Sequence, residues 1–181
     1  MIAQIIHNPN RKDRLQNILE QTAEQRIKYQ IWDATLSVNP IEGCHRSHRK
    51  IVQWAQATRE PMVWIMEDDC IFTAPNAAEE FLKKIPAEFD IYTAGTYGQV
   101  CKYNSDDGTM RRMSGTHCYI VHSRFYEEFL NLDVHEHIDV AISNATRPHL
   151  CLPMTALQMP GISDVAGDGA EVDYNQSNYV V

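Results

Sequence analysis

One stretch, VWIMEDDCIF (63–72), most constrains how this 181-residue chain can fold. Residues 62–66 form a continuous apolar run, which is typical of a strand covered on both faces by other elements. The run ends in three consecutive carboxylates, Glu67, Asp68 and Asp69. In parallel α/β sheets, ligands gather at the carboxyl ends of the strands. The stretch therefore predicts a buried central strand with an acidic site at its end.

The rest of the chain alternates between strand and helix patterns, which predicts an α/β fold with a mixed, mostly parallel sheet flanked by helices. Strands are expected at 3–7, 27–34, 62–66, 89–95, 117–122 and 149–154. Helices are expected within 8–25 and at 45–58, 77–85 and 124–132, with a short helix or turn at 137–146. The pattern predicts one compact domain over 1–158 and a loop-like tail over 159–181.

Local signals mark several boundaries of these elements. Asn76 followed by Glu79 resembles a capping box, and Ser123 is expected to cap the helix that follows it. The SDDG sequence (105–108) predicts a turn between two short extended segments.

Composition limits the classes of partner and location. The net charge of −8 argues against a protein that binds nucleic acid through its phosphates. No apolar run approaches the roughly 18 residues needed to cross a bilayer, and no signal peptide is visible. The five cysteines are odd in number and form no CxxC pair, so reduced thiols and a cytoplasmic location are expected.

The acidic run predicts a metal site. Side chains alternate along an extended chain, so Glu67 and Asp69 are expected to point together and Asp68 the other way. Buried carboxylates side by side repel each other unless a cation neutralises them. Mg²⁺ or Mn²⁺ suits this role, because such ions take one or two carboxylates together with substrate phosphates. The competing interpretation is a solvated acidic turn.

Two other polar stretches carry weaker signals. In NPNRKDR (8–14), Arg11 and Arg14 lie near the start of a helix, where guanidinium groups and free N–H groups suit a phosphate; a solvated first turn is the alternative. In GCHRSHRK (43–50), a zinc site lacks a second ligand pair. Ser47 and His48 are therefore interpreted as polar groups near a ligand pocket. The absence of a GxSxG sequence argues against a serine hydrolase.

Seven segments in collinear order resemble glycosyltransferase family 25, the lipopolysaccharide and collagen-type galactosyltransferase family. They are IIHNPNRKDR, YQIWDA, GCHRSHRKIVQWA, VWIMEDDCIF, GTHCYIVHSRFYEEFL, HIDVAIS and LCLPMTALQ. The resemblance implies a GT-A-like single domain that transfers a sugar, such as galactose, from a nucleotide sugar with inversion. It implies a UDP-sugar as the usual donor and a glycan or lipid-linked glycan as the acceptor. A lipid-linked acceptor would bring peripheral contact with a membrane.

The resemblance also implies roles for particular residues. Glu67 and Asp69 are implied to hold Mn²⁺ or Mg²⁺, with Asp68 assisting or contacting the donor sugar. The residues implied to bind the donor are Asn8, Arg11, Arg14, Asp33, Ser47 and His48. Asp139 in HIDVAIS is the candidate general base, and His117 and Tyr119 are expected on the acceptor side.

Two alternatives to a glycosyltransferase stay open. One is a catalytically silent relative that binds a nucleotide or glycan as an interaction module. The other is a metal-dependent phosphodiesterase or nuclease, against which the net charge counts. The chain is shorter than the family usually is between Gly95 and Arg112 and after Gln158, where acceptor specificity would reside.

Overall fold

The computed structural model describes residues 1–97, 102–162 and 171–172. The helices are α1 (Lys12–Glu24), α2 (Pro40–Thr58), α3 (Ala77–Lys83), α4 (Tyr126–Leu130) and α5 (Ile138–Ala145), with a 3₁₀ turn η1 (Ser123–Phe125). The strands are β1 (Ala3–His7), β2 (Tyr29–Asp33), β3 (Met62–Glu67), β4 (Cys70–Phe72), β5 (Ile91–Thr93), β6 (Tyr103–Asn104), β7 (Thr109–Met110), β8 (Cys118–His122), β9 (His149–Leu150), β10 (Ala156–Gln158), β11 (Gly161–Ile162) and β12 (Glu171–Val172).

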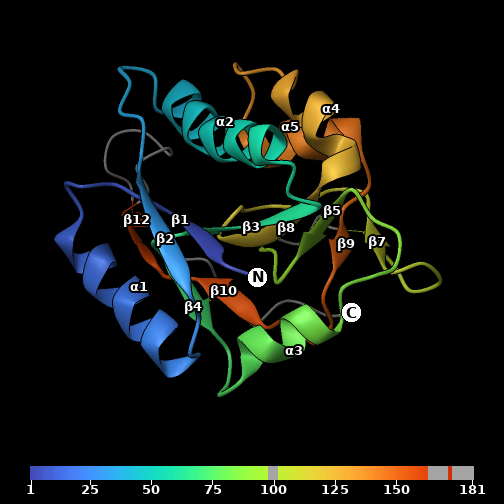
Figure 1. The fold of residues 1–181 in the computed structure, drawn as a ribbon, viewed down its shortest axis with the longest axis horizontal. Helices are drawn as coiled ribbons and strands as arrows, with labels where there is room; N and C mark the ends of the chain where they lie inside the picture. The colour runs from blue at the N-terminus through green and yellow to red at the C-terminus, as the bar shows by residue number, and fades with distance from the viewer. Residues whose placement is uncertain (98–101, 163–170, 173–181) are drawn as a thin grey trace.

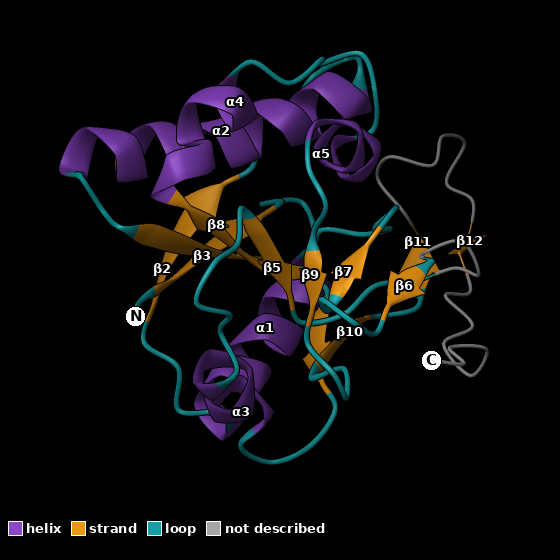
Figure 2. Ribbon diagram, turned by 90° about the vertical axis from the view of Figure 1, so that its right-hand side faces the viewer, coloured by secondary structure: helices purple, strands orange, loops and turns teal. Residues whose placement is uncertain are grey.

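Eight of the described strands form one mixed sheet in the order β2-β1-β3-β8-β5-β9-β7-β6. Within this sheet β8 and β7 run against the other strands, so the sheet is mostly parallel in strand direction. Helices α2, α4 and α5 cover one face, and α1 and α3 lie on the other, which gives three layers (Figures 1 and 2). The expected α/β class, with helices flanking a mixed and mostly parallel sheet, is confirmed.

The core lies on both faces of the sheet, and β3 contributes to both. Val63 and Ile65 pack in the cluster under α2 and α4, while Trp64 and Met66 pack in the cluster toward α1 and α3. All four side chains are at most 2% exposed. A strand covered on both faces has no solvent side to fill with polar residues, which explains the unbroken apolar run of its sequence.

Most predicted elements lie where the patterns placed them, but helix α2 begins five residues before the predicted start. It starts at Pro40 rather than at residue 45, and the Asn39 side chain accepts a hydrogen bond from the Ile41 N–H at 3.1 Å. Proline suits the first helical position, because it has no N–H to leave unpaired and its φ angle is already helical. Pro40, a residue type that often ends a helix, therefore marks the start of one here.

Two predicted helix caps are wrong. Asn76 adopts a left-handed φ of 64° and its side chain makes no capping hydrogen bond, so no capping box forms with Glu79. Ser123 is the first residue of η1, and the side chain of His122 caps it by accepting a hydrogen bond from the Arg124 N–H. The predicted turn at 105–108 is confirmed, since β6 and β7 pair antiparallel on either side of it.

The chain after Gln158 contributes a short antiparallel pair, β11 with β12, inside the segment predicted to be loop-like. Residues 163–170 and 173–181 of that segment lie outside the described residues. Free thiols are present at Cys44, Cys70, Cys118 and Cys151, and Cys101 also lies outside the described residues. Among the helices the structure describes, none is long and apolar enough to cross a membrane.

Amide side chains on α1 hold the segment that follows β3. Asn17 Nδ2 donates to the carbonyl oxygens of Asp68 and Cys70, both at 3.1 Å. One turn later, Gln21 Oε1 accepts from the Phe72 N–H at 2.7 Å. Strand β4, which belongs to this segment, pairs on its other side with β10. These amides take the place of a neighbouring strand, so α1 fixes the position of the acidic turn between β3 and β4.

Asn17→Ala is expected to lower the free energy of unfolding by about 1–3 kcal/mol, because it leaves two carbonyl groups of this segment without their donor. Urea unfolding followed by circular dichroism measures the change. Gln16→Ala is the matched control, since Gln16 is exposed on the same helix and bonds only Glu20 among the contacts described for it. Equal stability of the two variants would contradict the positioning role of Asn17.

Candidate functional site

A cavity of about 330 Å³ lies at the carboxyl ends of β1, β2 and β3, which are neighbours in the sheet and parallel. We call it the first cavity. Its wall is built from the residues that follow these strands and from the first turns of α1 and α2. The residues that line it are Ile6, Asn8, Arg14, Ala34, Thr35, Leu36, Ser37, Pro40, Gly43, Cys44, Ser47, His48, Glu67, Asp68, Asp69 and Gln158.

The three consecutive carboxylates all line this cavity. The expectation that Asp68 points away from Glu67 and Asp69 is wrong, because β3 ends at Glu67 and residues 68–69 form a turn. Strand alternation therefore no longer applies beyond Glu67. Asp68 Oδ2 lies 2.8 Å from His7 Nδ1 and accepts the Asn8 N–H at 3.0 Å, which ties the turn to the end of β1.

Arg14 is the charge partner of this turn. Its Nη1 lies 3.2 Å from Asp69 Oδ2 and 3.4 Å from Asp68 Oδ1, and the residue is only 8% exposed. Among the described residues that line the cavity it is the one lysine or arginine. Three carboxylates thus face one permanent positive charge. A further cation would therefore bring the net charge of the cavity closer to neutral.

Glu67 is held by residues from two other elements. His48 Nε2 lies 3.3 Å from Glu67 Oε1, and the Thr116 hydroxyl donates to the same oxygen. Burial alone would raise the pKa of Glu67, but the hydrogen bond and charge of His48, with Thr116, bring this pKa to about 2. His48 is itself oriented by the buried Tyr119 hydroxyl, 2.7 Å from Nδ1. Glu67 is therefore a carboxylate at neutral pH.

Asp69 has the opposite character. Burial and the neighbouring charge of Glu67 raise its pKa to about 7, against the opposing effects of Arg14 and of a 3.0 Å hydrogen bond from Gln158 Nε2. Its other oxygen, Oδ1, is buried without a hydrogen-bond partner among the described residues. Burial also raises the pKa of Asp68, although the Asn8 N–H and His7 oppose this. The turn holds negative charge that its surroundings only partly compensate.

These observations test whether a divalent cation fits the turn. No group of three or more His, Cys, Asp or Glu side chains suited to a metal exists in the described part of the chain. Mg²⁺ and Mn²⁺ do not need such a group, because they commonly take one or two carboxylates and complete their shell with water and substrate phosphate. The partnerless Asp69 Oδ1 and the ionised Glu67 supply two oxygen donors of this kind. The residues present fit the ion.

A second, smaller cavity of about 80 Å³ adjoins the first. Cys44, Glu67 and Gln158 line both, so these three side chains stand between them. Asp139 lines the second cavity from the first turn of α5. Its Oδ2 accepts the Gly115 N–H at 2.9 Å and its Oδ1 accepts the Val140 N–H at 2.8 Å. Asp139 is thus a fixed carboxylate on the far side of Glu67 from Arg14.

The structure brings most of the predicted site residues to these two cavities. Those that line the first are Asn8, Arg14, Ser47, His48, Glu67, Asp68 and Asp69, and Asp139 lines the second. Ser47 serves the wall itself, since its hydroxyl accepts the Thr35 N–H and donates to the Gly43 carbonyl, both at 2.8 Å.

Four predicted placements need correction. Arg11, the N-cap residue of α1, pairs with Asp13 of the first turn at 2.8 Å and does not line the first cavity. Asp33 ends the edge strand β2 with its side chain exposed outside the cavity. His117 and Tyr119, expected on the acceptor side, are at most 1% exposed. Tyr119 lies in β8, an interior strand of the sheet, and His117 directly precedes that strand. Neither side chain lines either cavity.

Sequence reasoning missed three residues that shape the site, namely His7, Thr116 and Gln158. His7 is the last residue of β1 and was a visible signal, since a polar residue that ends an apolar strand lies at the sheet's ligand-binding edge. Thr116 and Gln158 come from segments distant in sequence that only strand pairing brings beside β3 and β4.

Comparisons with known proteins give structural likeness only. No protein-family model and no curated protein sequence matches the chain. The crystal structure of A197 from STIV shares 12% identity over 88% of this chain and 86% of its own, with a TM-score of 0.61. HddC from Yersinia pseudotuberculosis, in complex with GMP-PN, shares 8% identity over 87% and 93%, with a TM-score of 0.55. At such identities the likeness establishes a shared fold.

A third solved structure is a glycosyltransferase involved in the glycosylation of the major capsid of PBCV-1. It shares 12% identity over 71% of this chain and 64% of its own, and its TM-score of 0.44 is too low to support an argument.

Proposed function

We propose that the protein is a metal-dependent glycosyltransferase that moves a sugar from a nucleotide-sugar donor, a UDP-sugar in our proposal, to a hydroxyl group of a glycan. One observation carries the proposal: the first cavity joins three carboxylates, a buried arginine and Asn8 of the connection between β1 and α1. Carboxylates alone repel a diphosphate, whereas carboxylates with a divalent cation and an arginine hold one. The HddC complex supports the proposal, since a protein of this fold was crystallised with GMP-PN. The resemblance of the sequence to family 25 points to the same chemistry, although no family model matches the chain.

In the proposed complex, each group has a task that its position favours. Arg14 and the segment at Asn8 bind the diphosphate, and the 34–37 loop borders the nucleoside. Mn²⁺ or Mg²⁺, held by Glu67 and Asp69, would stabilise the negative charge that develops on the departing nucleotide. Asp68 keeps the turn attached to β1 through His7 and Asn8. His48, oriented by Tyr119, keeps Glu67 ionised.

The transfer itself is a displacement with inversion. The oxygen of the acceptor hydroxyl bonds to the anomeric carbon, and its proton passes to a carboxylate, for which Asp139 is our candidate. The bond between the anomeric carbon and the phosphate oxygen breaks, and its electron pair leaves with the nucleoside diphosphate. Glu67 lies between the cavity of Arg14 and the cavity of Asp139, so the donor and acceptor would approach the anomeric carbon from different sides.

One observation favours a second candidate function, a nucleotide-binding module without transfer. Arg14 already pairs with both Asp68 and Asp69, so part of the role of a metal is taken by the chain itself. This candidate retains donor binding and lacks turnover, so an assay of sugar transfer by the unchanged protein separates it from the enzyme.

The proposal is tested by calorimetric titration of the purified protein with UDP, UDP-galactose, UDP-glucose and uridine, each with Mn²⁺ and with a chelator. We expect the diphosphates to bind and uridine to bind at least about tenfold more weakly, since the site is organised around the diphosphate. We expect the chelator to weaken the binding of the diphosphates by a similar factor. GDP-mannose serves as the control for the base.

A protein that binds none of these nucleotides, with or without Mn²⁺, would refute the donor site. Binding that is tight but indifferent to the chelator would refute the metal and leave Arg14 as the cation of the site.

A further inference from the structure

The second cavity differs from the first in the charge of its lining. Its polar side chains include Glu67, Asp139, Thr116 and His137, and its apolar wall comes from Ile41, Tyr97 and Ile138. None of the described residues that line it is a lysine or an arginine. The first cavity, by contrast, holds the buried guanidinium of Arg14 beside its carboxylates. The two cavities are therefore suited to chemically different ligands.

The residues outside the described part of the chain offer no positively charged side chain to this cavity. Residues 98–101, 163–170 and 173–181 contain no lysine, arginine or histidine, and they include Asp164, Asp168 and Asp173. A phosphate or carboxylate group in the second cavity would therefore meet the fixed carboxylate of Asp139, beside a Glu67 that would share its charge with the metal, and no arginine or lysine from these residues would balance Asp139. The electrostatic repulsion between such a group and the carboxylate acts over a short distance in a partly buried site, where charges interact more strongly than in water.

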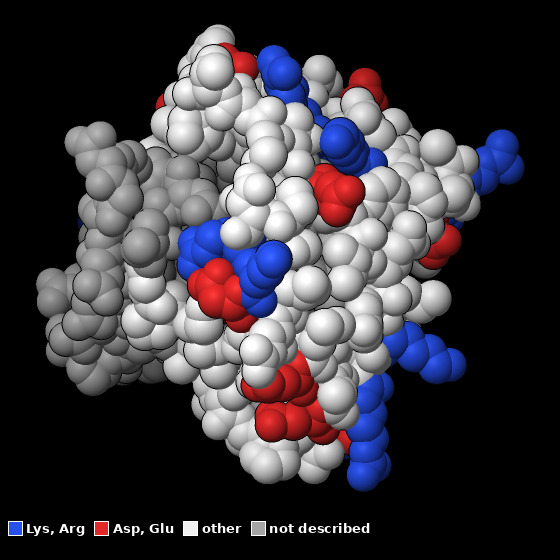
Figure 3. Space-filling view, turned by 90° about the vertical axis from the view of Figure 1, so that its left-hand side faces the viewer, with Lys and Arg blue, Asp and Glu red and all other residues white. Residues whose placement is uncertain are grey.

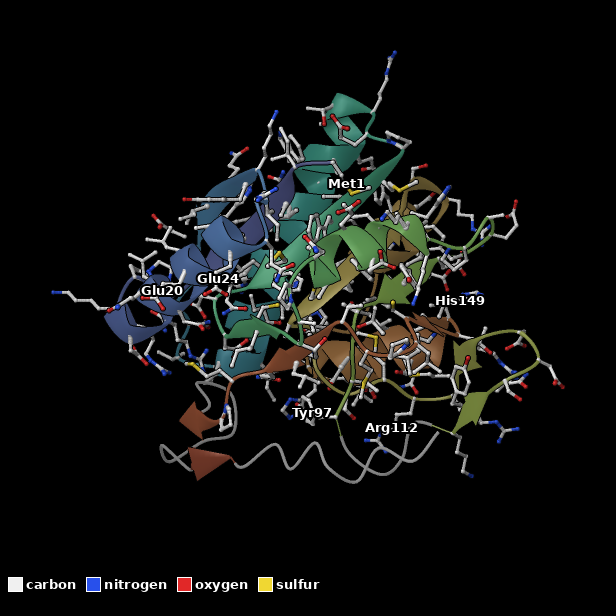
Figure 4. The ribbon with its side chains drawn as sticks, turned by 90° about the horizontal axis from the view of Figure 1, so that it is seen from below. Met1, Glu20, Glu24, Tyr97, Arg112 and His149 are labelled. Carbon is white, nitrogen blue, oxygen red and sulfur yellow. The ribbon has the colours of Figure 1, made fainter. Side chains whose placement is uncertain are left out.

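A hydroxyl group meets the opposite situation. It donates a hydrogen bond, which the carboxylate of Asp139 can accept in addition to the two that it already receives. Both oxygens of Asp139 are fixed by backbone N–H groups, from Gly115 and Val140, so its direction is set before a ligand arrives. Tyr97 adds an aromatic face, which suits the C–H surface of a sugar ring. Figure 4 shows Tyr97 on a different side of the molecule from Glu20 and Glu24 of α1.

We infer that the second cavity is the acceptor site and that it takes an uncharged sugar unit, excluding acceptors that carry a phosphate or carboxylate there. The inference rests on the proposed function and adds the substrate class of its acceptor. Because the cavity is small, about 80 Å³, it encloses the reacting part of one sugar unit and leaves the remainder of a glycan outside. The site would therefore select acceptors by the charge of their terminal sugar unit, which carries the reacting hydroxyl.

The test measures binding of small sugars to the whole protein, loaded with UDP and Mn²⁺, by saturation-transfer NMR. The probes are methyl galactoside and methyl glucoside, which are neutral, and galacturonate, glucuronate and glucose 6-phosphate, which are anionic. We expect the neutral probes to bind and each anionic probe to bind at least about tenfold more weakly than its neutral counterpart. Equal binding of both kinds would overturn the inference, as would a failure of every sugar to bind while UDP still binds. That last result leaves the donor site standing.

Two variants show whether this cavity is the source of the discrimination. Ile41→Lys puts a positive charge into the wall of the second cavity, and we expect it to admit the anionic probes and close most of the tenfold gap. Ile41→Gln is its uncharged control.

Asp139→Asn removes one of the two charges and is expected to narrow the difference in binding between neutral and anionic probes. Asp133→Asn, which changes an exposed carboxylate in the loop before α5, should leave this difference unchanged. UDP binding checks that each variant is folded. An unchanged gap in both Ile41→Lys and Asp139→Asn would overturn the inference.

Discussion

Asp69→Asn is expected to lose metal-dependent nucleotide binding and, at the same time, to become more stable than the unchanged protein at pH 8. The loss follows from removing one of the two proposed metal carboxylates, and we expect the affinity for UDP in the presence of Mn²⁺ to fall about tenfold, to the value measured with a chelator. The gain follows from charge. The buried Asp68 and Asp69 and the half-buried Glu67 face one arginine, so removing one negative charge relieves a repulsion within the fold.

The sign of the pH dependence follows from the pKa of Asp69. In the folded protein this pKa is about 7, against 3.8 for an ordinary aspartate. Between these values the folded state keeps a proton that the unfolded state has lost, so the contribution of Asp69 to stability falls as the pH rises from about 4 to 7. The advantage of asparagine is therefore largest above pH 7 and disappears below about pH 4. We expect it to be on the order of 1–3 kcal/mol at pH 8.

Thermal and urea unfolding at pH 4, 6 and 8, in the presence of a chelator, measure this advantage. Asp106→Asn is the matched control, because Asp106 is an exposed carboxylate in the turn between β6 and β7. A variant that is less stable than the unchanged protein at pH 8 would mean that the pairing of Asp69 with Arg14 outweighs the repulsion from Glu67. The acidic turn would then be a structural ion pair, without the uncompensated negative charge that favours a bound cation.

The sequence predicted those elements whose pattern reflects their burial. The apolar run of β3 arises because both of its faces are covered, and α2 shows its stripe at Ile51, Val52 and Ala55 because only one face is buried. The errors lie at the boundaries of helices, where the conformation of a single residue determines where the helix starts and how it is capped. Helix α2 begins at Pro40 instead of residue 45, and Asn76 uses its tolerance of a left-handed φ rather than its side-chain oxygen.

The composition of the candidate site was predictable where it follows a strand in sequence. Asn8 and the acidic triplet could be placed because each comes directly after an apolar strand. Thr116 and Gln158 could not, because their position depends on antiparallel pairing of β8 with β3 and of β10 with β4. The errors at His117 and Tyr119 have the same origin, since β8 is an interior strand of the sheet that sequence alone does not order.

The absence of a nucleic-acid partner stays a prediction, and surface charge bears on where phosphate chemistry would take place. On the face in Figure 3, lysine and arginine side chains are separated from one another or lie beside acidic groups, without a broad basic area. A phosphate backbone requires several adjacent cations. The phosphate chemistry of this chain is therefore proposed for the first cavity, where Arg14 is buried, and not for this face.

Asp139→Asn is expected to reduce sugar transfer by about 10²–10⁴-fold, the usual contribution of a general base, while UDP binding stays within about twofold. Binding is preserved because Asp139 lines the second cavity and makes no contact described with the residues of the first that would hold the diphosphate. The asparagine keeps the shape of the side chain and one acceptor oxygen, but one of the N–H groups of Gly115 and Val140 loses its partner. A stability loss of about 1–2 kcal/mol is expected for that reason.

Release of UDP from a UDP-sugar in the presence of a neutral sugar acceptor measures the transfer, over a range of pH. A general base gives the rate a rising limb with pH that the variant lacks, whereas a residue that only positions Gly115 lowers the rate without changing the shape of the profile. Asp133→Asn controls for the change of charge near α5. If transfer survives in Asp139→Asn with an unchanged profile, the base is another group, and Glu67 is the remaining carboxylate that borders both cavities among the described residues. If the unchanged protein binds UDP-sugars and transfers none, the second candidate, binding without transfer, replaces the enzyme.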